Sequence, residues 1–187
     1  MSSSIFNFAN PELYAITAAH AGQTSGQITT WVTLGALVPE HLRVVATISP
    51  QNFTFGLIRN SQRFIVNLLA EGQQDWLPLF GLRSTREVNK FEGILCETTA
   101  DGIPILPETC GWAECQIVQE VDLGDRVIVI ADVLNHQVNE SRKPLCRAEA
   151  MAALPPEVRQ ALAQKRLLDI ECDRALLQAY QSRSATQ

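Results

Sequence analysis

Short runs of apolar and β-branched residues recur through the first 140 positions, and these runs predict strands. Four of them, at 27–34, 42–49, 63–69 and 125–138, are rich in Val, Ile, Thr or Phe. A fifth run, 111–121, is joined to the last by DLGD, a sequence typical of turns, so an antiparallel hairpin is expected there. Residues 14–22 predict a further strand, paired with 27–34 through the sequence QTSG.

Helical patterns are short in this region and longer after it. Segment 54–62 begins with Thr54, a common N-cap residue, and places the apolar Phe55 and Ile58 three residues apart. Segment 72–81 predicts a second short helix, which Pro78 shortens or kinks. From 153 to 180 the apolar residues follow a loose 3–4 spacing, which predicts one or two helices beginning at the proline pair 155–156.

The order of these elements favours a mainly β fold, a β-barrel with helical decorations. The connections between strands are too short for repeated βαβ units, so a parallel doubly wound sheet is not expected. The change of pattern near residue 145 predicts a barrel domain at 1–145 and a helical C-terminal extension at 146–187. The extension is expected to pack on the barrel or on a dimer partner.

Composition and charge exclude several classes of function. The chain is 46% hydrophobic with a net charge of −5, so we expect a globular protein that does not bind nucleic acid. Its five cysteines, an odd number without a C-x-x-C pair, favour reduced thiols and a cytoplasmic protein. No signal peptide and no apolar run of about 20 residues appears, so no membrane association is expected. The three histidines are scattered and indicate no metal site.

The common catalytic motifs do not occur. The sequence lacks a P-loop, a G-x-G-x-x-G fingerprint, a G-x-S-x-G elbow and an H-E-x-x-H pair. The carboxylates are scattered, and none forms a recognisable acid–base dyad. We therefore nominate no catalytic side chain.

Eight short segments, in their order along the chain, resemble the flavin reductase-like, FMN-binding split-barrel family. They are 27–31 (QITTW), 52–58 (NFTFGLI), 64–69 (FIVNLL), 80–81 (FG), 90–91 (KF), 102–106 (GIPIL), 112–115 (WAEC) and 124–125 (GD). The resemblance covers residues 14–138 and implies an FMN-binding split barrel with a helical C-terminal tail. Members of this family are commonly homodimers with flavin sites near the subunit interface.

The resemblance also implies where the flavin lies. Segment 27–30 would meet the ring and the ribityl chain with backbone amides and hydroxyls, and segment 49–54 would hold the phosphate where a helix starts. Segment 83–86, with Arg83 and Arg86, adds positive charge. The expected cofactor-binding residues are Gln27, Ile28, Thr29, Thr30, Ser49, Gln51, Asn52, Thr54, Arg83 and Ser84.

Each of these residues alone also has a structural interpretation. Thr29 and Thr30 suit any strand, and Thr54 suits any helix start. The three tryptophans are more typical of core positions than of flavin contacts. Only the ordered combination of segments favours a flavin site.

The function implied by the resemblance is hydride transfer from NAD(P)H to FMN, or to FAD, after which reduced flavin leaves or passes electrons to an acceptor protein. Family reductases often carry a histidine after the Gly-Asp pair, where this chain has Arg126. That difference and the added tail favour the alternative of a non-catalytic FMN-binding redox partner, carrier or sensor. A pyridoxamine-phosphate-oxidase-like activity, or a haem or F420 ligand, is a more distant alternative.

Overall fold

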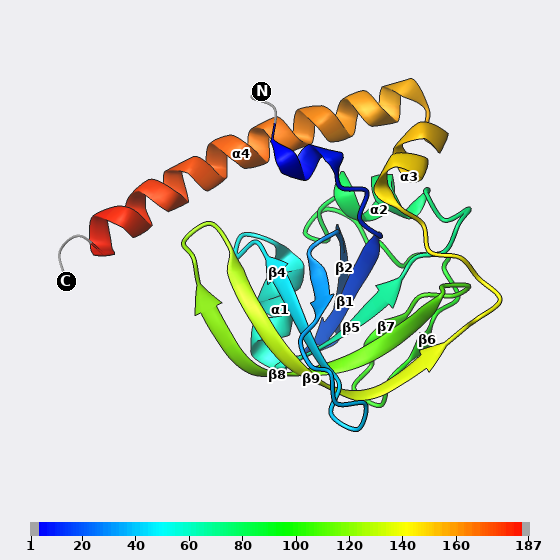
Figure 1. Ribbon diagram of the computed structural model, residues 1–187. Helices are drawn as coiled ribbons and strands as arrows, with labels where there is room; N and C mark the ends of the chain where they lie inside the picture. The colour runs from blue at the N-terminus through cyan, green and yellow to red at the C-terminus, as the bar shows by residue number, and fades with distance from the viewer. Residues whose placement is uncertain (1–3, 185–187) are drawn as a thin grey trace.

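A curled antiparallel sheet forms the body of the computed structural model, which describes residues 4–184 (Figure 1). Within these residues the sheet has seven strands in the order β2-β1-β5-β8-β9-β4-β3. The strands are β1 (Tyr14–His20), β2 (Gln23–Thr29), β3 (Val32–Leu34), β4 (Arg43–Ile48), β5 (Arg63–Leu68), β8 (Gly111–Asp122) and β9 (Val127–Val138). A two-stranded ribbon, β6 (Glu97–Thr98) and β7 (Pro104–Ile105), lies beside it. The prediction of a mainly β, barrel-like fold is confirmed.

The first hairpin turns earlier than the sequence predicted. β1 and β2 are joined by Ala21 and Gly22, which both have positive φ, and the QTSG stretch lies inside β2 rather than in the turn. The predicted strand 27–34 is also wrong as one unit, because β2 ends at Thr29 and β3 lies at the opposite edge of the sheet. The chain crosses the end of the half-barrel at Thr30 and Trp31.

β2 needs small residues because two helices pack closely against it. A Cβ atom at Gly26 would lie 2.5 Å from the ring of Phe80. The hydroxyl of Ser25 forms hydrogen bonds of 2.8 Å and 2.7 Å with the hydroxyls of Thr54 and Thr85. Tertiary packing, rather than a turn, therefore explains the small polar stretch.

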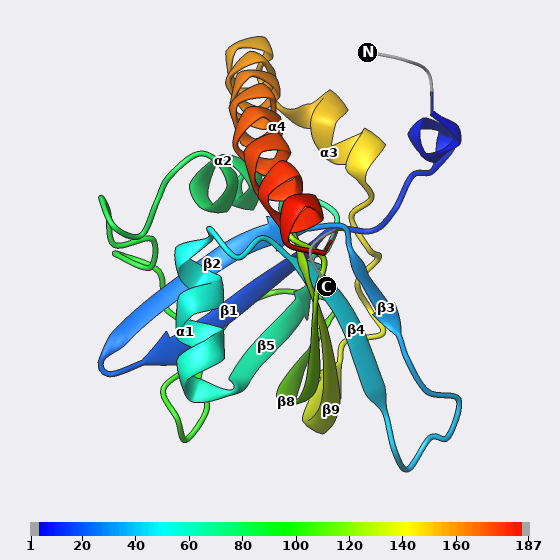
Figure 2. The ribbon, with the colours of Figure 1, turned by 90° about the vertical axis from the view of Figure 1, so that its left-hand side faces the viewer.

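Helix α1 (Phe53–Ser61) fills the concave side of the curled sheet (Figure 2). Phe55 and Ile58, the pair that predicted its buried face, are 2% and 0% exposed. The prediction that Thr54 is the N-cap is wrong. The helix begins one residue earlier than predicted, at Phe53, and Asn52 is in the cap position. The Thr54 side chain is buried and bonds Ser25 instead.

The remaining helices gather at one end of the half-barrel. α2 (Trp76–Gly81) is shorter than the predicted 72–81 and accommodates Pro78 in its first turn, where a backbone donor is not needed. The C-terminal segment forms α3 (Arg147–Ala153), which the sequence did not predict, and α4 (Pro156–Ser184), which confirms the prediction of a helix starting at the proline pair. A short 3₁₀ turn, η1 (Ile5–Phe8), precedes β1.

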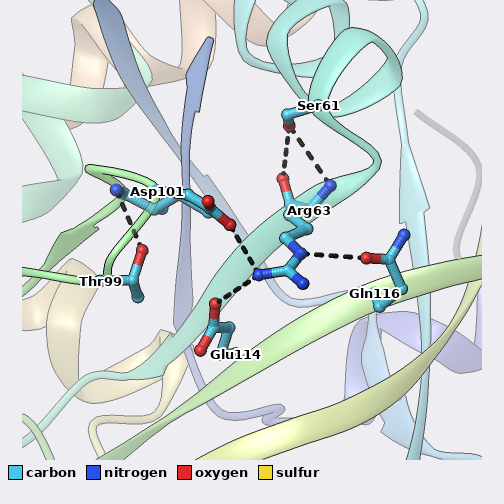
Figure 3. Close-up of polar contacts among 7 residues, drawn as sticks. Ser61, Arg63, Thr99, Asp101, Glu114 and Gln116 are labelled. Atoms are coloured by element: carbon cyan, nitrogen blue, oxygen red, sulfur yellow. Dashed lines mark hydrogen bonds and ion pairs between the residues drawn. The ribbon is translucent and has the colours of Figure 1, made fainter.

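The predicted hairpin of β8 and β9 is confirmed, and a polar network attaches the β6–β7 ribbon beside it (Figure 3). Nη1 of Arg63 lies 2.6 Å from a carboxylate oxygen of Asp101 and 3.5 Å from one of Glu114. Nε of Arg63 donates to the side chain of Gln116 at 3.0 Å. Arg63 therefore links the β6–β7 ribbon to the sheet.

Helix α4 crosses over the end of the half-barrel (Figures 1 and 2). None of its described residues is fully buried, and its inner face is half-buried. Leu162 approaches Gly81 of α2, and the hydroxyl of Tyr180 donates to the backbone oxygen of Asp122 at 3.3 Å. Within residues 4–184, no helix combines the length and the apolar character that crossing a membrane requires.

Candidate functional site

A pocket of about 160 Å³ opens where the ends of β2 and β4, the start of α1 and the middle of α4 meet. Six of the ten residues expected to bind cofactor line it: Gln27, Ile28, Thr29, Ser49, Gln51 and Asn52. They come from two segments, 27–29 and 49–52, that are about twenty residues apart in the sequence. The fold brings these segments together because β2 ends beside the loop that follows β4.

The other four expected residues do not line this pocket. Thr30 is half-buried at the strand crossing, and Thr54 is buried behind the pocket wall. Arg83 is exposed in the loop after α2, and the Ser84 hydroxyl accepts a hydrogen bond from the backbone N–H of Arg86.

The loop that carries Arg83 and Ser84 nevertheless lies beside the start of α1. The guanidinium of Arg86 lies 5.4 Å from the centre of the Phe53 ring, and Thr85 is linked to Thr54 through the Ser25 hydroxyl. The loop therefore places positive charge next to the helix N-terminus.

Polar groups in the pocket are held in place by short local bonds. Nδ2 of Asn52 donates to Oε1 of Gln27 at 2.8 Å, which joins the two segments directly. The backbone N–H of Trp31 donates to the hydroxyl of Thr29 at 3.0 Å. The Ser49 hydroxyl accepts weakly from the N–H of Gln51 at 3.4 Å.

Gln51 and Asn52, which line the pocket, directly precede the start of α1, and no side chain caps that helix. First-turn N–H groups of a helix have no partner within the helix and carry partial positive charge. Such an end, together with neighbouring hydroxyls and amides, is a common anion site. The donors present therefore fit a phosphate-bearing ligand such as FMN.

Arg126, in the turn between β8 and β9, contributes the positive charge of the pocket wall. It forms a two-pronged ion pair with Asp173 of α4, at 2.8 Å from Nη1 and 2.6 Å from Nη2. Its guanidinium also lies 5.4 Å from the centre of the Trp31 ring. Burial lowers the pKa of Arg126, but the hydrogen bonds and charge of Asp173 outweigh this and raise it above its ordinary value. The arginine is thus a permanent cation.

Sequence reasoning missed several lining residues. Trp31 was interpreted as a core residue, yet it is 54% exposed at the pocket rim. Asp169, Cys172 and Asp173 reach the pocket from α4. No local pattern marks these α4 residues, because their position depends on where the helix docks.

Lys90 supports the pocket from behind. It is 5% exposed, and its Nζ donates to the backbone oxygens of Gly26, at 2.9 Å, and Phe80, at 3.2 Å. Gly26 directly precedes Gln27, so this bond fixes the strand end that lines the pocket. Burial, with a smaller effect of Lys165, lowers the pKa of Lys90 to about 8.

This lowered pKa predicts a specific dependence of stability on pH. Between pH 8 and 10.5 the unfolded chain binds more protons at Lys90 than the folded chain, so stability should rise with pH in this window. Comparing wild type with Lys90→Met isolates this contribution, which we expect to grow by up to about 3 kcal/mol across the window. Urea unfolding at several pH values checks it. Parallel pH profiles for the two proteins would contradict the assignment.

The thiol buried in the core of the sheet, Cys115, is not a reactive site. All five are free, and burial, followed by the charge of Glu114, raises the pKa of Cys115 to about 12. A thiol with so high a pKa is a poor nucleophile. In residues 4–184, no group of three or more His, Cys, Asp or Glu side chains has an arrangement that would hold a metal ion.

Comparison with known proteins identifies a matching family. The model of the family described as "Flavin reductase like domain" matches residues 8–151. A putative diflavin flavoprotein A 3 from Nostoc is 28% identical over 130 residues, 69% of this chain but 22% of that protein. A ferric-chelate reductase (NAD(P)H) from Archaeoglobus fulgidus is 24% identical over 139 residues, 73% of this chain and 81% of that protein. The chain thus spans about a fifth of the first relative and most of the second.

Solved structures show the same architecture. A homologue of nitrilotriacetate monooxygenase component B from Mycobacterium thermoresistibile superimposes with a TM-score of 0.68 at 26% identity. The match covers 76% of this chain and 78% of that one. The split-barrel prediction is therefore confirmed.

Proposed function

Since the chain belongs to the flavin reductase-like domain family, we propose that its pocket binds FMN and that the protein transfers hydride from NAD(P)H to the flavin. One observation carries the proposal: two distant segments that resemble the family's flavin-binding segments meet in one pocket at an uncapped helix start. FAD is the second flavin that this site would accept.

The residues at the strand end would hold the ring and ribityl chain. The side chains of Gln27 and Asn52 fix each other, and the backbone of Ile28 and the hydroxyl of Thr29 border the same space. Ser49, Gln51 and the first turn of α1 would bind the phosphate. Thr30, Thr54, Arg83 and Ser84 are proposed as a supporting shell, in which the arginine adds positive potential.

The isoalloxazine ring supplies the redox chemistry when it is bound, so the protein's contribution is position and exclusion of water. No general acid or base in the pocket is required for hydride transfer. This agrees with a pocket in which Gln27, Asn52 and Thr29 form hydrogen bonds and the Asp173 carboxylate is held by Arg126.

Replacing Asn52 with alanine tests the site. Loss of the bond to Gln27 and of a polar group at the helix start should weaken FMN binding about 10- to 100-fold, the equivalent of one or two charge-assisted hydrogen bonds. Flavin fluorescence titration measures this. Asn135→Ala, an exposed position on β9, is the matched control and should bind FMN as wild type does. Equal affinities for all three proteins would place the flavin elsewhere.

A non-catalytic FMN-binding partner is the second candidate, favoured because α4 fills the side of the pocket where Arg126 lies. Turnover separates the two functions. A reductase oxidises many equivalents of NADH or NADPH per protein when free flavin is present, whereas a carrier is reduced at most once per bound flavin.

We also propose that the protein forms a homodimer through the other end of the half-barrel, and that residues 146–187 form an extension to a barrel unit at 1–145. An apolar groove of about 300 Å³ lies there between β3, β4 and the strands β5, β8 and β9. Leu34 and Val138 line it and are 60% and 66% exposed. Exposed apolar surface of this kind is typical of a subunit interface.

Leu34→Asp should convert the dimer to a monomer, because the change buries a charge at the interface but costs the folded monomer little. Leu168→Asp is the matched control: Leu168 is 63% exposed, on α4. Light scattering coupled to gel filtration gives the mass of each variant. If Leu168→Asp dissociated the dimer and Leu34→Asp did not, the interface would lie on α4 instead.

A further inference from the structure

The pocket has the polar groups for a flavin but little free volume. It measures about 160 Å³, whereas sites for small molecules usually span about 300–1,000 Å³. Helix α4 forms one wall of this space, because Asp169, Cys172 and Asp173 line it. Two of these side chains are carboxylates, which repel an anionic ligand.

Asp173 also binds Arg126, the residue of the pocket best suited to bind an anion. The guanidinium of Arg126 presents a planar pair of N–H donors, and the Asp173 carboxylate accepts from both. A phosphate offers the same paired oxygens, so it matches this fork equally well. The guanidinium also lies over the ring of Trp31. The carboxylate therefore stands where a phosphate group of a ligand would bind.

The helix that carries Asp173 is lightly held. No described residue of α4 is fully buried, and Leu167 and Leu168 are 50% and 63% exposed. Its start is fixed by Leu162 against α2, and its far end by Tyr180 beside Gly124. Displacing the middle and far end therefore requires breaking the Arg126–Asp173 ion pair and separating Tyr180 from the β8–β9 turn, without exposing a fully buried side chain of α4.

We propose that α4 is an intramolecular competitor of the pocket's phosphate-bearing ligand: Asp173 binds Arg126 in place of a phosphate group, so that docking of α4 and binding of the ligand exclude each other. The inference rests on the proposed function, since the ligand is the flavin mononucleotide or the nicotinamide dinucleotide. Because such coupling is reciprocal, the ligand releases α4 as strongly as α4 weakens the ligand.

Asp173→Asn tests the competition, because it keeps the shape of the side chain and removes the charge that holds Arg126. Glu171→Gln is the control, since Glu171 lies on the same helix but pairs with Arg174. Affinities are measured for FMN, riboflavin, NADH and NADPH. Hydrogen exchange of the α4 amides is followed with and without each ligand.

We expect Asp173→Asn to bind the phosphate-bearing ligand about tenfold more tightly, because the docked form of α4 loses one charge-assisted contact with Arg126. The ligand affinity of Glu171→Gln should equal that of wild type. Exchange in α4 should be faster in Asp173→Asn, and ligand should speed it in wild type. If Asp173→Asn gains affinity for FMN but not for riboflavin, the phosphate that binds Arg126 is that of the flavin. If it gains affinity for NADH and NADPH alone, the phosphate is that of the dinucleotide.

Other outcomes separate this inference from the proposed function. Flavin binding that is the same in wild type and Asp173→Asn, with α4 exchange unaffected by any ligand, overturns the competition and leaves the proposed function standing. A tighter dinucleotide complex in Asp173→Asn without any flavin binding overturns the proposed function and keeps the competition. Absence of all binding in both proteins overturns both.

Discussion

Replacing Asn67 with alanine should lower the free energy of unfolding by about 3–5 kcal/mol, because it combines a cavity with stranded polar groups. Asn67 lies fully buried in β5. Its Nδ2 donates to the backbone oxygen of Ala15 at 3.1 Å and to the Thr17 hydroxyl at 3.3 Å. Its Oδ1 accepts from the N–H of Leu106 at 3.0 Å. One side chain thus joins β1, β5 and the segment after β7.

Thermal unfolding followed by circular dichroism measures this effect. A chain of this length should lose roughly 10 °C in melting temperature for a change of this size. Asn135→Ala removes the same group from an exposed strand position and should stay within about 0.5 kcal/mol of wild type. A melting temperature for Asn67→Ala that matches this control would show that the network carries little of the stability.

Features that depend on neighbouring residues in the chain could be predicted from the sequence. The β8–β9 hairpin follows from two β-rich runs around a turn sequence, and the start of α4 follows from Pro155 and Pro156. Both are decided by local backbone preferences. The curled sheet follows from the order of strands and the short connections between them.

Features that depend on packing between distant segments were predicted wrongly from the sequence. The stretch containing Ser25 and Gly26 looked like a turn because its residues are small. They are small because Phe80 and Thr54 approach the strand closely, from segments more than 25 residues away. Composition alone does not separate these two causes.

The candidate site shows the same division. The two segments that meet through Gln27 and Asn52 could be identified by resemblance, because their residues are near one another within each segment. The pairing of Arg126 with Asp173 could not, since it joins a turn and a helix 47 residues apart. How open the pocket is therefore depends on a contact that only the structure reveals.

Gly26→Ala should lower both stability and flavin affinity, because it forces β2 away from α2. The new Cβ would lie 2.5 Å and 2.8 Å from two ring carbons of Phe80. That ring is stacked on Trp76, with centroids 5.3 Å apart, and Lys90 bonds the backbone oxygens of both Gly26 and Phe80. The ring therefore has little room to move, and we expect a loss of about 2–3 kcal/mol in the free energy of unfolding.

The effect on the pocket follows from the displaced strand. Gln27 is the next residue, so its bond to Asn52 should lengthen and FMN affinity should fall about tenfold, as for one lost hydrogen bond. Gly56→Ala is the control: outside its chain neighbours and the nearby backbone of α1, no heavy atom lies within 4 Å of its new Cβ, and alanine should stabilise α1 by about 0.5–1 kcal/mol. Adding Phe80→Leu to Gly26→Ala should restore part of both losses, since the shorter side chain relieves the contact. If Gly26→Ala lost stability but kept full FMN affinity, the position of β2 would not govern the site.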